Sequence, residues 1–272
     1  MIVGGGIAGL TAATAMQRHG FAPELVERSA GWPAIGAGIH LPANGLRVLR
    51  ALGLGEAVER AAAEVCRWGF FDQQGEPLCE TNLRELWREV GPCLGITRVK
   101  LQEVLLTGAA AAPHRLGVAL TALRQDGSTI DVRFSDGTSG SYDLVVGADG
   151  IRSAVREFAI ASSPPAYSGQ MVWRSVIPTR PTGMADMMIL VGERSFFGVA
   201  PMGEGHTYGF GVVDGERFEE FPRDASTASG VALPNSARRF PRTSPRCNPI
   251  TGSTSGRLNM WSSTNGIGVE WS

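Results

Sequence analysis

Three glycines near the start of the sequence have the spacing of a phosphate-binding turn. Gly4-x-Gly6-x-x-Gly9 follows the apolar residues Met1–Val3 and opens a helical stretch that extends to about His19. Gly4 permits a tight turn, Gly6 lets a pyrophosphate approach N–H groups at the helix N-terminus, and Gly9 permits close packing of helix against strand. The pattern predicts a strand, turn and helix that bind a dinucleotide.

A carboxylate at the expected distance strengthens this prediction. Glu27 ends a second short apolar stretch, Pro23–Glu27, and lies 18 residues after Gly9. An acidic residue at the end of the second strand accepts hydrogen bonds from ribose hydroxyls in dinucleotide-binding folds. We therefore assign Glu27 to the ribose. A glycine-rich turn without a ligand is the alternative reading.

A second chemical motif occurs in the middle of the chain. Tyr142–Val146 reads as a strand, and Gly147-Ala148-Asp149-Gly150 follows it directly. This order places a carboxylate and a bare stretch of backbone at a strand end. Arginines in the helix that follows could meet phosphate charge there.

The composition limits the classes of function. The chain has 272 residues, of which 43% are hydrophobic and 19% charged, so it is a globular protein of one or two domains. Its net charge of -1 argues against a nucleic-acid partner or an anionic membrane surface. No apolar run is long enough to span a membrane. The four cysteines form no CxxC pair, which indicates a reducing, cytoplasmic compartment and no metal site.

The elements between the two motifs do not continue as the regular βα units of an NAD-type fold. The periodicity and turn residues predict helices at 44–52 and 99–106, a strand pair at 66–72 and 76–80, and a hairpin at 117–124 and 129–134. Beyond Pro164-Pro165 the pattern changes to strands, at 172–178, 187–191, 195–200 and 207–213. These strands indicate an antiparallel sheet.

The two motifs, together with Arg98 between them, resemble the FAD-dependent aromatic hydroxylases, the flavoprotein monooxygenases with the para-hydroxybenzoate hydroxylase fold. The resemblance covers about residues 1–223. It implies an α/β protein with a Rossmann-like FAD-binding domain and an antiparallel β-sheet substrate domain. The implied cofactor-binding residues are Gly4, Gly6, Gly9, Glu27, Arg28, Gly38, Arg98, Asp149 and Gly150.

The resemblance also implies a discontinuous arrangement of domains. The FAD-binding domain would comprise residues 1–65 and 97–164, and the substrate domain residues 66–96 and 165–223. Arg28 would lie beside the adenine, and Arg98 would open a helix and itself contact the flavin cofactor. Gly38 belongs to a loop of small residues that resembles the family's cofactor-covering segment.

Two residues of the predicted sheet are candidates for the catalytic site. Trp173-Arg174 resembles the Trp-Arg pair of the salicylate-hydroxylase-like branch, in which the arginine is assigned to the active site. Tyr208 falls near the position of a second active-site residue of that branch. Ordinary strand-surface roles are the alternative for both.

The activity that the resemblance implies is hydroxylation of a small phenolic compound. In such enzymes NAD(P)H reduces the FAD, and O2 supplies the oxygen atom that enters the ring. The alternatives are a related FAD-dependent reductase or epoxidase, and a non-catalytic flavin-binding remnant. The substrate and the oligomeric state stay open.

The last part of the sequence does not resemble the family. Residues 224–272 are rich in Ser and Thr, show no sustained helical or strand period, and lack the family's Gly-Asp-Ala-Ala-His motif. We expect that this tail replaces the family's C-terminal third, through truncation or a frameshift, and impairs hydroxylation. A divergent natural tail is the alternative.

Overall fold

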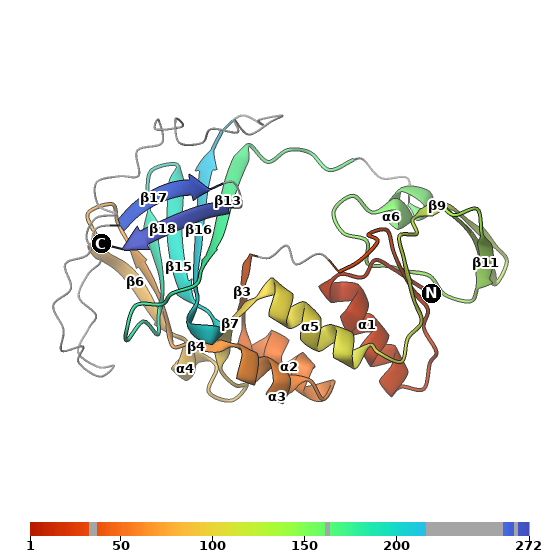
Figure 1. Cartoon of the computed structure of the whole chain (residues 1–272), viewed down its shortest axis with the longest axis horizontal. Coiled ribbons are helices and arrows are strands. Elements are labelled where there is room, and N and C mark those ends of the chain that lie inside the picture. Colours follow the sequence, from red (N-terminus) through yellow and green to blue (C-terminus); the bar gives the residue numbers. More distant parts are fainter. Residues whose placement is uncertain (33–36, 161–163, 216–257, 264–265, 272) are drawn as a thin grey trace. The chain divides into compact units, whose positions relative to one another are not determined.

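The computed structural model describes residues 1–32, 37–160 and 164–215, and the backbone of two strands at 258–263 and 266–271. The chain folds into two compact units. Unit 1 contains residues 1–35, 48–58 and 99–166, and unit 2 contains residues 36–47, 59–98 and 167–272. The protein is a mixture of helices and sheets (Figure 1).

Unit 1 is built around a parallel sheet of four short strands in the order β12-β1-β2-β8. The strands are β1 (Ile2–Val3), β2 (Leu25–Glu27), β8 (His114–Leu116) and β12 (Val146–Gly147). Helix α1 (Ile7–Arg18) connects β1 to β2. The strand, turn and helix predicted at the first glycine motif are therefore present.

A second sheet of unit 1 is antiparallel, in the order β11-β10-β9. It consists of β9 (Leu120–Asp126), β10 (Thr129–Phe134) and β11 (Ser139–Tyr142), and α6 (Ala154–Ala159) packs against β9. The hairpin predicted at 117–124 and 129–134 is confirmed, because β9 and β10 pair antiparallel. Its second strand has the predicted bounds, whereas its first strand begins at Leu120, and three residues separate β9 from β8. Gly117, with a φ of 72°, lies between them. A buried cluster that includes Val3, Val26 and Phe134 joins the two sheets.

Three helices include, or begin at, positions where the chain passes from one unit to the other. They are α2 (Ala43–Ala51), α3 (Gly55–Ala61) and α5 (Arg98–Gly108). The helices predicted at 44–52 and 99–106 correspond to α2 and α5. Among the described residues, no helix is long and apolar enough to cross a membrane.

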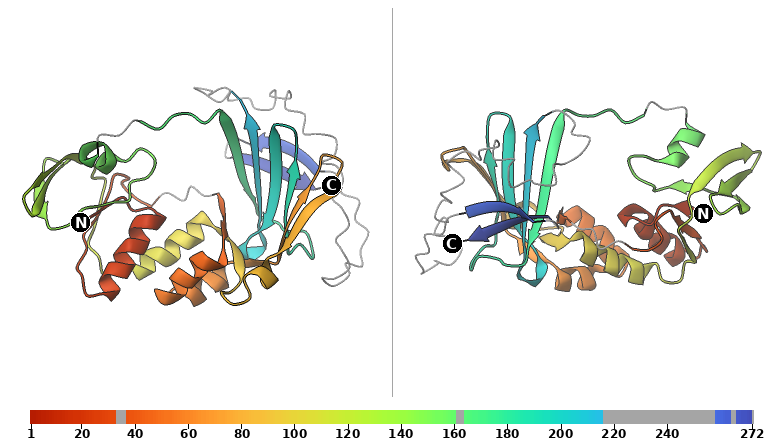
Figure 2. Two further views of the ribbon diagram at one scale, coloured as in Figure 1. Left: turned by 180° about the vertical axis from the view of Figure 1, so that it is seen from behind. Right: turned by 45° about the horizontal axis from the view of Figure 1, so that its top comes forward.

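The main sheet of unit 2 has six strands in the order β13-β16-β15-β14-β5-β6. Both views in Figure 2 show the long strands β13 to β16 as one twisted sheet. All neighbouring pairs are antiparallel except β14 and β5, which are parallel. The strands are β5 (Arg67–Phe71), β6 (Pro77–Asn82), β13 (Gln170–Ile177), β14 (Met187–Val191), β15 (Ser195–Pro201) and β16 (Thr207–Asp214).

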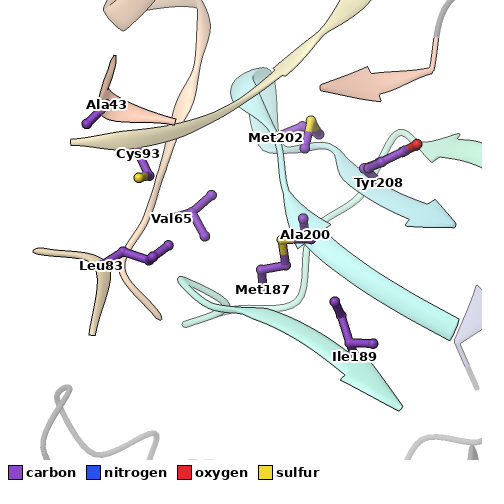
Figure 3. Close-up of a cluster of buried hydrophobic side chains, with 9 residues drawn as sticks. All are labelled: Ala43, Val65, Leu83, Cys93, Met187, Ile189, Ala200, Met202 and Tyr208. Carbon is purple, nitrogen blue, oxygen red and sulfur yellow. The ribbon is translucent and has the colours of Figure 1, made fainter. Parts of the chain in front are cut away.

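A smaller antiparallel sheet of unit 2 has the order β3-β7-β4. Its strands are β3 (Gly38–Leu41), β4 (Ala63–Val65) and β7 (Cys93–Thr97), and two short helices, α4 (Leu83–Leu86) and η1 (Gly203–Gly205), complete the unit. Among the described residues, a core cluster of nine buried side chains includes Met187, Met202 and Tyr208 (Figure 3). Burying these apolar groups stabilises unit 2.

The observed units differ from the predicted domains chiefly in two segments. Residues 36–47 and 59–65 belong to the predicted FAD-binding domain, but their packing places them in unit 2. The reason is strand pairing, because β3 and β4 both form hydrogen-bonded ladders with β7. Periodicity finds strands but does not reveal which strands pair.

The tail contains one element that the sequence did not indicate. Strands β17 (Leu258–Ser263) and β18 (Gly266–Trp271) form an antiparallel pair, and β18 lies beside β13 (Figure 1). These two strands are present although the segment shows no sustained strand period. The other residues predicted as tail lie outside the described residues.

Candidate functional site

Two of the three motif glycines are required by close packing in unit 1. A Cβ atom on Gly9 would lie 1.8 Å from the carbonyl oxygen of Gly4, so only glycine lets α1 begin so close to β1. Gly4 has a φ of 105°, and a Cβ there would lie 2.4 Å from the carbonyl oxygen of Ala148. These contacts fix the turn between strand and helix.

Gly6 has a different environment, because it faces open space. A Cβ atom on Gly6 would meet no atom within 4 Å. Gly6 is the N-cap residue of α1, where no side chain caps the helix and no acidic residue occupies the first turn. An uncapped helix N-terminus presents N–H groups and a positive dipole end to an anion. The space beside Gly6 thus suits a phosphate group.

Glu27 ties the end of β2 to the glycine loop. Its carboxylate accepts hydrogen bonds from the backbone N–H of Gly5, at 2.7 Å, and from that of Ser29, at 2.8 Å. Partial burial raises the pKa of Glu27, but these hydrogen bonds and the charge of Arg28 outweigh it, so the pKa lies below its usual value. Glu27 is therefore ionised at neutral pH. A charged carboxylate at this place can accept hydrogen bonds from hydroxyl groups.

Asp149 lies after β12 and binds the start of α6. Its carboxylate accepts hydrogen bonds from the Ser153 hydroxyl, at 2.6 Å, and from the backbone N–H groups of Ala154 and Val155. Ser153 itself caps the helix by accepting from the N–H of Arg156. Gly150 is exposed, with a φ of 83°. Asp149 therefore organises the loop after β12, whatever further contact it makes.

Two residues beside the glycine loop were not predicted from the sequence. The indole of Trp32 packs against Gly5, where an added Cβ would lie 2.5 Å from the ring. The side-chain amide of Gln102, which is buried, donates to the carbonyl oxygen of Gly5 at 3.5 Å. Gln102 lies one helical turn after Arg98 in α5, but a buried glutamine leaves no signal in a hydrophobic pattern. Both residues contact Gly5 and thereby support the backbone of the loop.

The remaining predicted cofactor residues occupy different positions. Arg28 is exposed at the end of β2. Arg98 is the first residue of α5, and its backbone N–H donates to the carbonyl oxygen of Ala37 at 2.9 Å. Gly38 is buried in β3, and a Cβ there would lie 2.3 Å from the ring of Tyr208. Gly38 is thus needed for packing within unit 2.

Arg174 and Tyr208 lie on the same face of the main sheet. Arg174 pairs with Phe210 across β13 and β16, and Tyr208 is two residues before Phe210, so their side chains project to one side. Burial raises the pKa of Tyr208, and the nearby charge of Arg174 opposes this shift. Arg174 is exposed and has no ion-pair partner among the described residues. A cation beside a phenol suits an anionic aromatic ligand.

The features of unit 1 can be compared with the chemical groups of FAD. The open space at Gly6 and the uncapped start of α1 suit a pyrophosphate, and the ionised Glu27 suits a ribose. The described residues contain no cluster of metal-ligating side chains. The features at Gly6 and Glu27 are those that a pyrophosphate and a ribose require.

A protein-family model matches most of the chain. The family model described as FAD binding domain matches residues 1–227. The match includes the glycine loop, Glu27, the Asp149–Gly150 turn and both Arg174 and Tyr208.

Two curated proteins are similar in sequence. The aurachin C monooxygenase/isomerase of Stigmatella aurantiaca is 36% identical over 215 residues, which are 78% of this chain and 56% of that protein. The 3-amino-4-hydroxybenzoate 2-monooxygenase of Streptomyces cremeus is 32% identical over 243 residues, which are 85% of this chain and 60% of that protein. The chain thus spans less than two thirds of the length of these relatives.

A solved structure has a similar fold. HpxO of Klebsiella pneumoniae, complexed with FAD and uric acid, superposes with a TM-score of 0.74 at 28% identity. The superposition covers 84% of this chain and 59% of that one.

Proposed function

This chain belongs to the FAD binding domain family, and from that premise we propose that it binds FAD through unit 1 and carries the first part of an aromatic monooxygenase. The observation that supports FAD binding most directly is the open space beside Gly6 at the uncapped start of α1. The other two motif glycines are explained by packing, whereas packing does not explain a glycine at position 6.

The glycine loop and the residues around it then have distinct roles in binding FAD. The N–H groups at the start of α1 bind the pyrophosphate, and Glu27 accepts hydrogen bonds from the ribose. Trp32 and Gln102 hold Gly5 in place, and Asp149 keeps the loop after β12 in register with α6. Bound FAD supplies the redox chemistry, with NAD(P)H as the reductant and O2 as the oxidant.

We propose that Arg174 and Tyr208 face the substrate. A small aromatic ring that bears an acidic group would pair with the guanidinium of Arg174, and the hydroxyl of Tyr208 would orient the ring. The relatives named for aminohydroxybenzoate and urate act on compounds of this kind. Positioning and exclusion of water are the main contributions of a protein to flavin chemistry.

The proposal is tested with a variant that fills the open space at Gly6. Gly6 has an ordinary extended conformation, so Gly6→Val is compatible with the backbone. The purified chain is incubated with FAD and desalted, and the retained flavin absorbance is measured. Wild type should retain FAD, and Gly6→Val should bind it at least about 10-fold more weakly, because the side chain occupies the place of a phosphate.

Gly209→Val serves as the matched control. A Cβ on Gly209 also meets no atom within 4 Å, but this residue lies in β16 of unit 2. The control variant should bind FAD like wild type. Equal FAD affinity in wild type and Gly6→Val would disprove the proposed phosphate site.

A further inference from the structure

The main sheet of unit 2 carries a hollow that the proposed function does not use. It has a volume of about 530 Å³, which lies within the ordinary range for small-molecule sites. Its lining combines apolar and aromatic side chains with polar ones, which are Gln170, Glu193, Arg194, Ser195 and Asp214. The apolar lining includes Trp68, Phe70, Ile189, Phe196 and Val212.

The hollow lies on the same face of the sheet as Arg174 and Tyr208. Phe196 pairs with Val212 across β15 and β16, and Val212 is two residues after Phe210. Because side chains alternate along a strand, Val212, Phe210 and Tyr208 all project to one face. Arg174 pairs with Phe210 on that face. One surface of the sheet therefore carries both the proposed ring site and the hollow.

A row of aromatic rings connects the two places. Tyr208 stacks on Phe210 with ring centroids 5.2 Å apart, and Phe210 contacts Phe196 edge-on at 6.1 Å. Phe196 in turn lines the hollow. The ring of Phe210 lies across Gly198, where an added Cβ would be 2.3 Å from the ring. The path from Tyr208 to the hollow is thus apolar along its length.

The charges at the hollow and at Arg174 differ, and this difference determines which end of a ligand binds at each place. At the hollow, Arg194 forms an ion pair with Asp214 at 3.0 Å, so its charge is already compensated. At the other end, Arg174 has no ion-pair partner within the part of the chain that the structure describes. An anionic group therefore gains more at Arg174 than at the rim of the hollow.

We infer that this face binds an aromatic acid that carries an extended apolar substituent, with the acidic ring at Arg174 and Tyr208 and the substituent in the hollow. The inference rests on the proposed function for its ring site and adds the substituent. A single ring would leave Trp68, Phe70 and Phe196 without contact to the ligand. Each methylene group of the substituent that is buried against these side chains increases the affinity of the ligand.

The test is a binding series with the full chain and three probes, 4-methylbenzoate, 4-butylbenzoate and 4-octylbenzoate, measured by calorimetry. The expected result for wild type is at least about 30-fold tighter binding of the octyl compound than of the methyl compound, because each buried methylene contributes to affinity. An affinity that does not depend on chain length would overturn the inference.

Two variants distinguish binding of the alkyl chain in the hollow from nonspecific binding elsewhere on the surface. Val191 is partly exposed and lines the hollow, so Val191→Trp should fill part of it. The gain in affinity from the methyl to the octyl compound should then fall to less than about 3-fold, and the affinity for the methyl compound should not change. Leu78→Trp adds the same group on exposed β6, outside the lining, and should keep the full gain. An unchanged gain in Val191→Trp would also overturn the inference.

A third variant distinguishes this inference from the proposed function. Arg174→Gln should weaken all three probes about equally, by about 10-fold, and leave their ratio unchanged. If Arg174→Gln has no effect but the chain-length gain persists and is lost in Val191→Trp, the ring site is wrong and the hollow stands. If Arg174→Gln weakens binding without any chain-length gain, the ring site stands and the hollow is wrong.

Discussion

Glu27 combines a structural task with the proposed ribose contact. Its carboxylate accepts hydrogen bonds from the backbone N–H groups of Gly5 and Ser29. Charged acceptors make stronger hydrogen bonds than neutral ones, so Glu27→Gln should lower FAD affinity by about 10-fold or more. Flavin titration measures this effect. Glu76→Gln changes an exposed glutamate of unit 2 and should leave affinity unchanged.

The same residue predicts a pH dependence of stability. Because the pKa of Glu27 is lowered in the folded state, its contribution is fully present above the usual glutamate pKa and is lost as pH falls through the lowered value. Urea unfolding of wild type and Glu27→Gln should therefore differ at pH 7 and converge below about pH 4. A difference that grows on acidification would contradict the assigned hydrogen bonds.

Tyr142 predicts the opposite dependence, at high pH. Partial burial and a 2.5 Å hydrogen bond to the Glu24 carboxylate raise the pKa of Tyr142 to about 12. This stabilising contribution is present below the usual tyrosine pKa and is lost as pH rises through about 12. An ultraviolet titration should show a tyrosine that ionises in that range. Tyr142→Phe should remove this transition.

At the scale of elements, the turn from β12 to α6 allows stability and cofactor binding to be separated. Ser153→Ala removes a helix cap and should lower the free energy of unfolding by about 1 kcal/mol without changing FAD affinity. Asp149→Ala removes three hydrogen bonds and should lower stability further. Urea unfolding and flavin titration measure the two effects. FAD affinity that also falls in Asp149→Ala would assign this carboxylate to the cofactor.

The elements differ in how well the sequence predicts them. The glycine loop was predictable because its conformation depends on residues only a few positions apart, and the turn-separated strands of the main sheet were predictable for the same reason. The pairing of β3 and β4 with β7 was not, because it joins segments more than 25 residues apart in the sequence. Trp32 and Gln102 were missed because only the folded chain brings them to Gly5.

At the scale of the molecule, β12 leaves unit 1 with an open edge among the described strands. It is one of the two outermost strands of the parallel sheet, and large apolar side chains near it are exposed, Ile151 at 74% and Phe158 at 43%. Open strand edges and apolar patches favour association. Light scattering of the chain should therefore detect oligomers. The double change Ile151→Lys and Phe158→Lys should reduce them, whereas Phe21→Lys, 63% exposed just after α1, should not.

The place of β1 in the parallel sheet has a consequence for synthesis of the protein. β1 pairs with β2, about 23 residues later, and with β12, about 144 residues later. Ribosomes add about 5–20 residues per second, so β1 waits about 7 to 30 seconds for its second neighbour. The glycine loop therefore leaves the ribosome long before the strand that completes its sheet, and β1 must stay unpaired on one side throughout that interval.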